Sequence, residues 1–191
     1  MNELYNACTL CPRKCHINRN LTTGVCNNTS SIKVARSALH YFEEPSISGS
    51  NGSGTIFFSG CNLKCCYCQN KEISTNNFGI NISIKRLSEL MLDLQSKKAN
   101  NINLVTPTHF VPSIIEAIKL ARENGLNIPI VYNTSGYESV DTIKLLDGYV
   151  DIYLTDFKYF DNKLGEDLSK VKNYFEVAST ALDEMYKQVS K

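Results

Sequence analysis

From Thr55 onward the sequence alternates between short apolar runs and longer segments with helical periodicity. Short runs of β-branched and aromatic residues are typical of buried strands, whereas apolar residues that recur every three or four positions predict amphipathic helices. Four strand-helix units of this kind follow one another along the chain. Such a repeat predicts a parallel sheet with right-handed crossovers, so the expected fold class is α/β.

The expected strands are the apolar runs 55–59, 102–106, 128–132 and 150–154. Helices are expected from Ser83, which is a favourable N-cap, and over 111–124, 139–146, 164–170 and 174–189. A complete barrel of eight units takes about 250 residues. Because the chain has 191 residues, the expectation is a partial (β/α) barrel of about four strand-helix units.

The chain before the first unit divides into two parts. Residues 1–30 form a cysteine-rich, loop-like segment, and residues 31–54 are expected to be an extended linker that leads to the core domain at 55–191. Within the linker, residues 32–42 favour an extended conformation, and the Ser- and Gly-rich stretch 46–54 favours a flexible turn region.

The composition of the chain limits which binding partners and which cellular compartment we expect. The formal charge is +1 without a basic tail or acidic block, which does not favour binding of nucleic acid. We find no signal-peptide pattern and no apolar run of the roughly 20 residues that a membrane helix needs, so we expect a cytoplasmic protein without a membrane partner. In a reducing compartment, eight closely spaced cysteines favour metal sites over disulfides.

The most informative cysteines follow the first expected strand, in the segment SGCNLKCCYCQN. Cys61, Cys65 and Cys68 would place three thiolates around an iron-sulfur cluster and leave one iron open for a ligand. The alternative is zinc, for which this loop lacks a suitable fourth ligand. Cys66 directly follows Cys65, so binding of both to one ion would strain the loop; we expect Cys66 to be a small buried residue.

At this point the sequence resembles the radical S-adenosylmethionine (SAM) superfamily, and within it the pyruvate formate-lyase-activating-enzyme-like group. The segments that carry the resemblance are GSGTIFFSGCNLKCCYCQNKEIS, NINLVTPTHF, IPIVYNTSGY and DIYLTDFKY. The resemblance implies a [4Fe-4S] cluster whose open iron binds SAM. It also implies an electron donor such as flavodoxin or ferredoxin, reductive cleavage of SAM to a 5'-deoxyadenosyl radical, and activase-like oxidoreductase chemistry on a protein glycyl site.

The same resemblance assigns SAM contacts to Tyr67, Thr106, Asn133, Ser135, Asp156 and Lys158. Most of these residues follow expected strands, where the active site of a parallel strand-helix fold lies. Thr106 stands where many members have the acid of a Gly-Gly-Glu stretch, so a hydroxyl replaces a carboxylate. Asp156 and Lys158 have an equally simple alternative role as a surface ion pair. His109 is more readily explained as a structural histidine.

A second group of thiols lies near the start of the chain. Cys8, Cys11, Cys15 and Cys26 are enough for a closed zinc site or for a second, fully ligated [4Fe-4S] cluster, and their spacing leaves both open. His16 is an alternative ligand.

The end of the chain raises a further expectation, because similar enzymes have roughly six strand-helix units. The last expected strand would then be an uncovered edge. The chain would be a C-terminally shortened form that is a fragment, a subunit completed by a second chain, or a noncatalytic cluster-binding protein.

Overall fold

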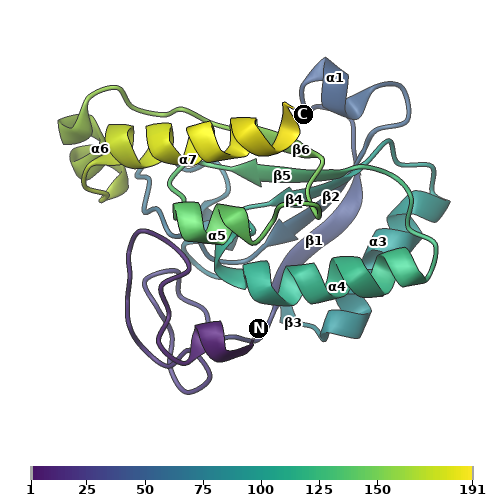
Figure 1. The fold of residues 1–191 in the computed structure, drawn as a ribbon, viewed down its shortest axis with the longest axis horizontal. Helices are drawn as coiled ribbons and strands as arrows, with labels where there is room; N and C mark the ends of the chain where they lie inside the picture. Colours follow the sequence, from purple (N-terminus) through teal and green to yellow (C-terminus); the bar gives the residue numbers. More distant parts are fainter. Residues whose placement is uncertain (1, 191) are drawn as a thin grey trace.

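The computed structural model describes residues 2–190, which form a six-stranded sheet with helices packed against it (Figure 1). The strands are β1 (Lys33–His40), β2 (Ser53–Phe58), β3 (Ile80–Asn81), β4 (Ile102–Val105), β5 (Ile130–Thr134) and β6 (Ile152–Thr155). Their order across the sheet is β3-β1-β2-β4-β5-β6. Neighbours from β2 to β6 are parallel, which confirms the expected α/β class and is consistent with a partial barrel.

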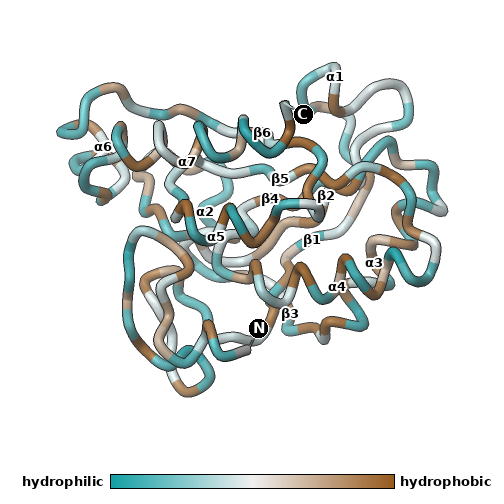
Figure 2. The backbone as a smooth tube through the Cα atoms, viewed as in Figure 1, coloured by the Kyte–Doolittle hydropathy of each residue, from teal (hydrophilic) through white to brown (hydrophobic). Residues whose placement is uncertain are grey.

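The helices are α1 (Pro45–Ser48), α2 (Lys71–Ser74), α3 (Ile84–Ser96), α4 (Val111–Glu123), α5 (Val140–Lys144), α6 (Asn162–Ser169) and α7 (Tyr174–Val189), with 3-10 turns η1 (Asn2–Tyr5) and η2 (Thr108–Phe110). Ser83 caps α3 as expected, because its hydroxyl accepts a hydrogen bond from the Arg86 N–H at 3.1 Å. Hydrophobic and hydrophilic residues alternate along α3 and α4 in Figure 2. Their apolar faces pack on one side of the sheet, over fully buried Ile102 and Leu104.

The region expected to be a linker contains a strand of the sheet. β1 pairs antiparallel with β2 and, at Lys33 and Val34, antiparallel with β3. The expectation of four strands therefore lacked β1 and β3, because the pairing partner of an extended segment is not encoded locally. The boundaries of the three expected domains stay a prediction.

The Ser- and Gly-rich stretch 46–54 was expected to be a flexible turn region, which is wrong at both of its ends. Its first residues belong to α1, whose Ser48 carbonyl accepts a hydrogen bond from the Asn100 side chain. Its last residues, Ser53 and Gly54, begin β2. An added Cβ at Gly54 would lie 2.8 Å from the Asn101 carbonyl oxygen. Gly54 therefore allows close strand packing here, not turn formation.

The N-terminal cysteine-rich segment forms a loop-rich lobe, drawn in purple in Figure 1, and Arg19 attaches it to the rest of the fold. The Arg19 side chain is 1% exposed. Its guanidinium donates hydrogen bonds to the carbonyls of Asn28, Thr29 and His109 at 3.1, 2.5 and 2.5 Å. Since η2 contains His109, these bonds join the lobe to the segment that follows β4.

In the part of the chain that the structure describes, every helix is too short or too polar to cross a membrane.

Candidate cluster and cofactor site

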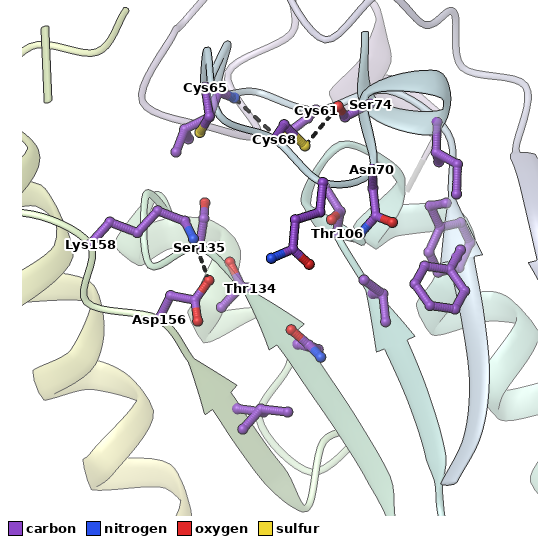
Figure 3. A pocket seen from close by; sticks show the side chains of 18 of the residues that line it. Cys61, Cys65, Cys68, Asn70, Ser74, Thr106, Thr134, Ser135, Asp156 and Lys158 are labelled. Atoms are coloured by element: carbon purple, nitrogen blue, oxygen red, sulfur yellow. Dashed lines mark hydrogen bonds and ion pairs between the residues drawn. The ribbon is translucent and has the colours of Figure 1, made fainter. Parts of the chain in front are cut away.

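A cavity of about 590 Å³ lies at the carboxyl ends of the parallel strands. Cys61, Cys65 and Cys68 line one side of it (Figure 3). Asp156 and Lys158 lie across the cavity from the cysteines (Figure 3). The volume is within the range of small-molecule sites, roughly 300–1,000 Å³, so the cavity can hold a ligand beside the three thiols.

The loop that carries these cysteines begins at Gly60, in a conformation that requires glycine. Gly60 has a φ of 80°, and an added Cβ would lie 2.0 Å from Asn28 Nδ2 and 2.2 Å from the Cys26 carbonyl oxygen. The Asn28 amide also donates to the Ser59 carbonyl at 2.7 Å. The N-terminal lobe therefore packs directly against the start of the loop, and a side chain at position 60 would separate them.

Hydrogen bonds hold the rest of the loop. The Lys64 N–H donates to the Ser169 carbonyl at 3.0 Å, and the Cys66 N–H donates to the Leu168 carbonyl at 2.9 Å. The buried Asn62 side chain donates to the Tyr137 carbonyl at 2.8 Å. The loop is thus clamped between the end of α6 and the segment that follows β5.

Each of the three thiols has a hydrogen-bonding neighbour. The Leu63 N–H donates to Cys61 Sγ at 3.4 Å, and the Ser169 hydroxyl donates to Cys65 Sγ at 2.9 Å. Ser74 Oγ lies 3.2 Å from Cys68 Sγ. Hydrogen bonds to ligand sulfurs are a common feature of iron-sulfur sites, where they orient the ligands and adjust the cluster.

The three thiols are not arranged around a single metal ion. Across residues 2–190, no group of three or more His, Cys, Asp or Glu side chains is arranged so that it could hold one metal ion. The thiolates of a cubane cluster bind separate irons, so they need not meet at one point. Burial raises the pKa of the Cys61 thiol to about 12. Metal coordination would supply the positive charge that stabilises this thiolate.

Cys66 was expected to be a small buried residue, which is wrong. Its side chain is exposed, although its backbone N–H is bonded to α6. The loop turns between Cys65 and Cys66, so the two neighbouring thiols have different surroundings: Cys65 receives a hydrogen bond and Cys66 faces solvent.

All six residues expected to contact SAM line the cavity, namely Tyr67, Thr106, Asn133, Ser135, Asp156 and Lys158. Lys158 Nζ donates to Asp156 Oδ2 at 2.6 Å, so this pair is an ion pair and also part of the cavity wall. Desolvation lowers the pKa of Lys158, but the hydrogen bond and charge of Asp156 outweigh it and raise the pKa overall. Lys158 is therefore a cation in the cavity wall at neutral pH.

Thr106 has an unusual backbone conformation. Its φ is 57°, in the left-handed region that β-branched residues rarely adopt. Its N–H donates to the Asn133 carbonyl at 2.9 Å, which joins the ends of β4 and β5 at the cavity. Such strained residues are frequent at functional sites.

His109 is a structural residue, as its isolated position in the sequence indicated. It is buried and absent from the cavity wall. Its Nε2–H donates to the Ser59 carbonyl at 2.8 Å, and burial lowers its pKa to about 3. The ring is therefore neutral and supports the strand that leads to the loop.

Sequence reasoning missed several residues of the site. The cavity wall also contains His40, Glu43, Glu44, Asn70, Ser74 and Thr134. Behind Thr134 lies Glu138, which is 2% exposed and accepts hydrogen bonds from Thr134 and from Thr108, the latter at 2.6 Å. Burial raises the pKa of Glu138 to about 7. An isolated Glu after a strand carries no local signal of burial, so only its polar neighbours Thr108 and Thr134 could have suggested this network.

The N-terminal thiols lie within the lobe and outside the cavity wall. Cys8, Cys11 and Cys26 are buried, and Cys15 is half-buried. An added Cβ at Gly24 would lie 3.6 Å from the Sγ atoms of both Cys15 and Cys26, so these two thiols face the same glycine. Burial raises the pKa values of Cys11 and Cys26, which makes both poor thiolates without a cation.

Comparison with known proteins identifies this arrangement. A family model described as the radical SAM superfamily matches residues 55–189. This chain belongs to the radical SAM superfamily. Membership implies a [4Fe-4S] cluster and SAM, for which the three thiols and the adjoining cavity are suited.

A relative extends the similarity beyond the radical SAM domain. An uncharacterised protein of Methanocaldococcus jannaschii is 37% identical over 183 residues, which cover 92% of this chain and 52% of that protein. The radical SAM chain described here thus spans about half the length of this curated relative.

Proposed function

We propose that this chain holds a [4Fe-4S] cluster at Cys61, Cys65 and Cys68, binds SAM in the adjoining cavity, and cleaves SAM reductively. A cluster held by these three cysteines would supply one electron and an iron with an open position for SAM. Its chemistry would be reductive cleavage of the C5'–S bond of SAM to methionine and a 5'-deoxyadenosyl radical able to take a hydrogen atom from a substrate. The observation that supports this proposal most directly is that three hydrogen-bonded thiols line one wall of a cavity at the carboxyl ends of parallel strands.

The protein side chains have positioning roles in this proposal. The Lys158 cation and the polar groups of Thr106, Asn133 and Ser135 would orient SAM within the cavity. Tyr67, directly before the third cysteine, would contact the adenine. Apolar lining residues such as Phe57 and Leu63 would limit access of water to the reactive radical.

The substrate proposal is a protein glycyl site. Several residues of the cavity wall are exposed, among them Glu44, Gln69 and Asn70, so the cavity has an open side through which a backbone segment can approach. A one-electron carrier such as flavodoxin or ferredoxin would supply the electron. We also propose that the N-terminal thiols Cys8, Cys11, Cys15 and Cys26 bind zinc or a second cluster, which requires their side chains to turn toward one another, because no such group within residues 2–190 is arranged around one metal ion.

The decisive experiment is anaerobic reconstitution with iron and sulfide, followed by reduction in the presence of SAM. We expect the visible absorbance of a cluster and release of 5'-deoxyadenosine. Alanine at Cys61, Cys65 or Cys68 should abolish the release of 5'-deoxyadenosine and the part of the absorbance that comes from this cluster. Cys66→Ala is the matched control and should retain both, because its side chain faces solvent. Full iron content in a Cys61→Ala, Cys65→Ala, Cys68→Ala triple variant would contradict the assignment.

A second candidate function is a noncatalytic cluster protein or a subunit that another chain completes. One observation favours it: within residues 2–190, β6 has a strand neighbour on one side alone. A reducible cluster that leaves SAM intact would support this candidate over the enzyme.

A further inference from the structure

A chain of hydroxyl groups connects the cavity to one of the cluster ligands. Ser169, the last residue of α6, donates through Oγ to Cys65 Sγ at 2.9 Å. The same Oγ lies 2.5 Å from the Tyr159 hydroxyl, which in turn is hydrogen-bonded to the hydroxyl of Tyr67. Tyr67 lines the cavity, so the chain runs from the cavity wall to the thiol.

The thiol fixes the direction of every hydrogen bond in this chain. A hydroxyl has one proton to donate, and a thiolate bound to iron can only accept. The Ser169 proton must therefore point to Cys65, which leaves the Ser169 oxygen to accept from Tyr159. Tyr159 then accepts from Tyr67. Once Cys65 is bound to iron, each hydroxyl therefore donates toward the sulfur: Tyr67 to Tyr159, Tyr159 to Ser169, and Ser169 to Cys65.

The backbone contacts and ring packing around these three hydroxyl groups do not depend on the hydroxyls themselves. Ser169 is fully buried, and its carbonyl accepts from the Lys64 N–H at 3.0 Å. Tyr159 is 6% exposed and packs edge-on against Tyr174, with ring centroids 5.1 Å apart. Removal of one hydroxyl should thus leave the backbone clamp and the ring packing in place.

We propose that Ser169 is a positioning residue that raises the reduction potential of a cluster held at Cys65, with Tyr159 keeping its hydroxyl aimed at the sulfur. An O–H dipole directed at sulfur stabilises negative charge there, and reduction adds one negative charge to the cluster. The reduced form therefore gains more from this hydrogen bond than the oxidised form. This inference rests on the proposed function, because it requires a cluster at the loop.

The test is an anaerobic redox titration of the reconstituted full chain without SAM, followed by electron paramagnetic resonance. Ser169→Ala should bind the same amount of iron and sulfide as the unmodified protein but reduce at a more negative potential. Tyr159→Phe should shift the potential in the same direction by a smaller amount. Ser96→Ala is the control and should cause no shift, because Ser96 is exposed at the end of α3 and bonds the Asp93 carbonyl.

The outcomes separate this inference from the proposed function. A loaded Ser169→Ala protein with the potential of the unmodified chain overturns the inference and leaves the function intact. If Ser169→Ala takes up no cluster, Tyr159→Phe decides, since an unshifted potential there overturns the inference as well. An unmodified chain that takes up no cluster overturns both.

Discussion

At the scale of single residues, two residues near the carboxyl ends of β4 and β5 are unusual, one for its backbone conformation and one for its burial. Thr106 has a left-handed backbone, which costs a β-branched residue about 1–2 kcal/mol. Glu138 is a buried carboxyl whose hydrogen-bond donors are hydroxyl groups, Thr108, Thr134 and Tyr132. Both residues oppose stability locally and both hold groups that line the cavity, since Thr134 is part of its wall. A role in shaping the cavity therefore accounts for these two locally unfavourable residues.

The Glu138 carboxyl should make stability depend on pH. Burial raises its pKa from 4.5 to about 7, so across this window the folded protein keeps a proton that the unfolded chain has lost. The unfolding free energy should therefore fall as pH rises through the window, by roughly 1 kcal/mol per pH unit and about 3 kcal/mol in total. Glu138→Gln, which keeps an acceptor for the two threonines, should remove this slope. Urea denaturation of both proteins at several pH values measures it, and equal slopes would refute the assignment.

At the scale of elements, the cysteine loop and the N-terminal lobe make contacts that a simple series of strand-helix units would not contain. The cysteine loop is bonded to the end of α6, and the N-terminal lobe packs on Gly60 at its start. The lobe is joined to η2 through Arg19, a buried cation whose guanidinium donates to three carbonyl oxygens and to Cys8 Sγ. The two groups of cysteines thus belong to one connected structure, although more than thirty residues separate Cys26 from Cys61 in the sequence.

Arg19→Met should weaken the attachment of the lobe. The variant leaves three carbonyl acceptors without their donor, and we expect the unfolding free energy to fall by about 3 kcal/mol. Arg86→Met is the matched control: Arg86 is exposed and pairs with Glu89, so its loss should change stability by less than about 0.5 kcal/mol. Chemical denaturation of the two variants gives the comparison. Equal, small effects would mean that the Arg19 bonds do not hold the lobe.

At the scale of the whole molecule, five strands of the sheet run in one direction and β1 runs against them, and the carboxyl ends of β2, β4, β5 and β6 border the cavity. All six residues expected to contact SAM line this cavity. Binding of SAM to the folded state should therefore stabilise the entire domain, even though the chain spans about half of its relative.

SAM at about 100 times its dissociation constant should stabilise the cluster-loaded protein by about 2.7 kcal/mol. For a chain of this size that corresponds to a rise in Tm of about 5–10 °C. The triple variant Cys61→Ala, Cys65→Ala, Cys68→Ala should show a much smaller rise, since the cluster contact with SAM is lost. Differential scanning calorimetry under anaerobic conditions checks this, and an equal rise in both proteins would place SAM away from the cysteines.

The parallel strand-helix core and the candidate cluster ligands could be predicted from the amino-acid sequence. Apolar periodicity is a local signal, and Cys61, Cys65 and Cys68 lie within eight residues, so neither needs long-range information. The resemblance to known proteins supplied the expected SAM contacts. Four features became visible only in the folded chain: β1 joins the sheet, Cys66 faces solvent, Glu138 is buried, and Ser169 bonds Cys65 across 104 residues of sequence. Burial and hydrogen-bond partners depend on segments that meet only when the chain folds, so no local pattern can encode them.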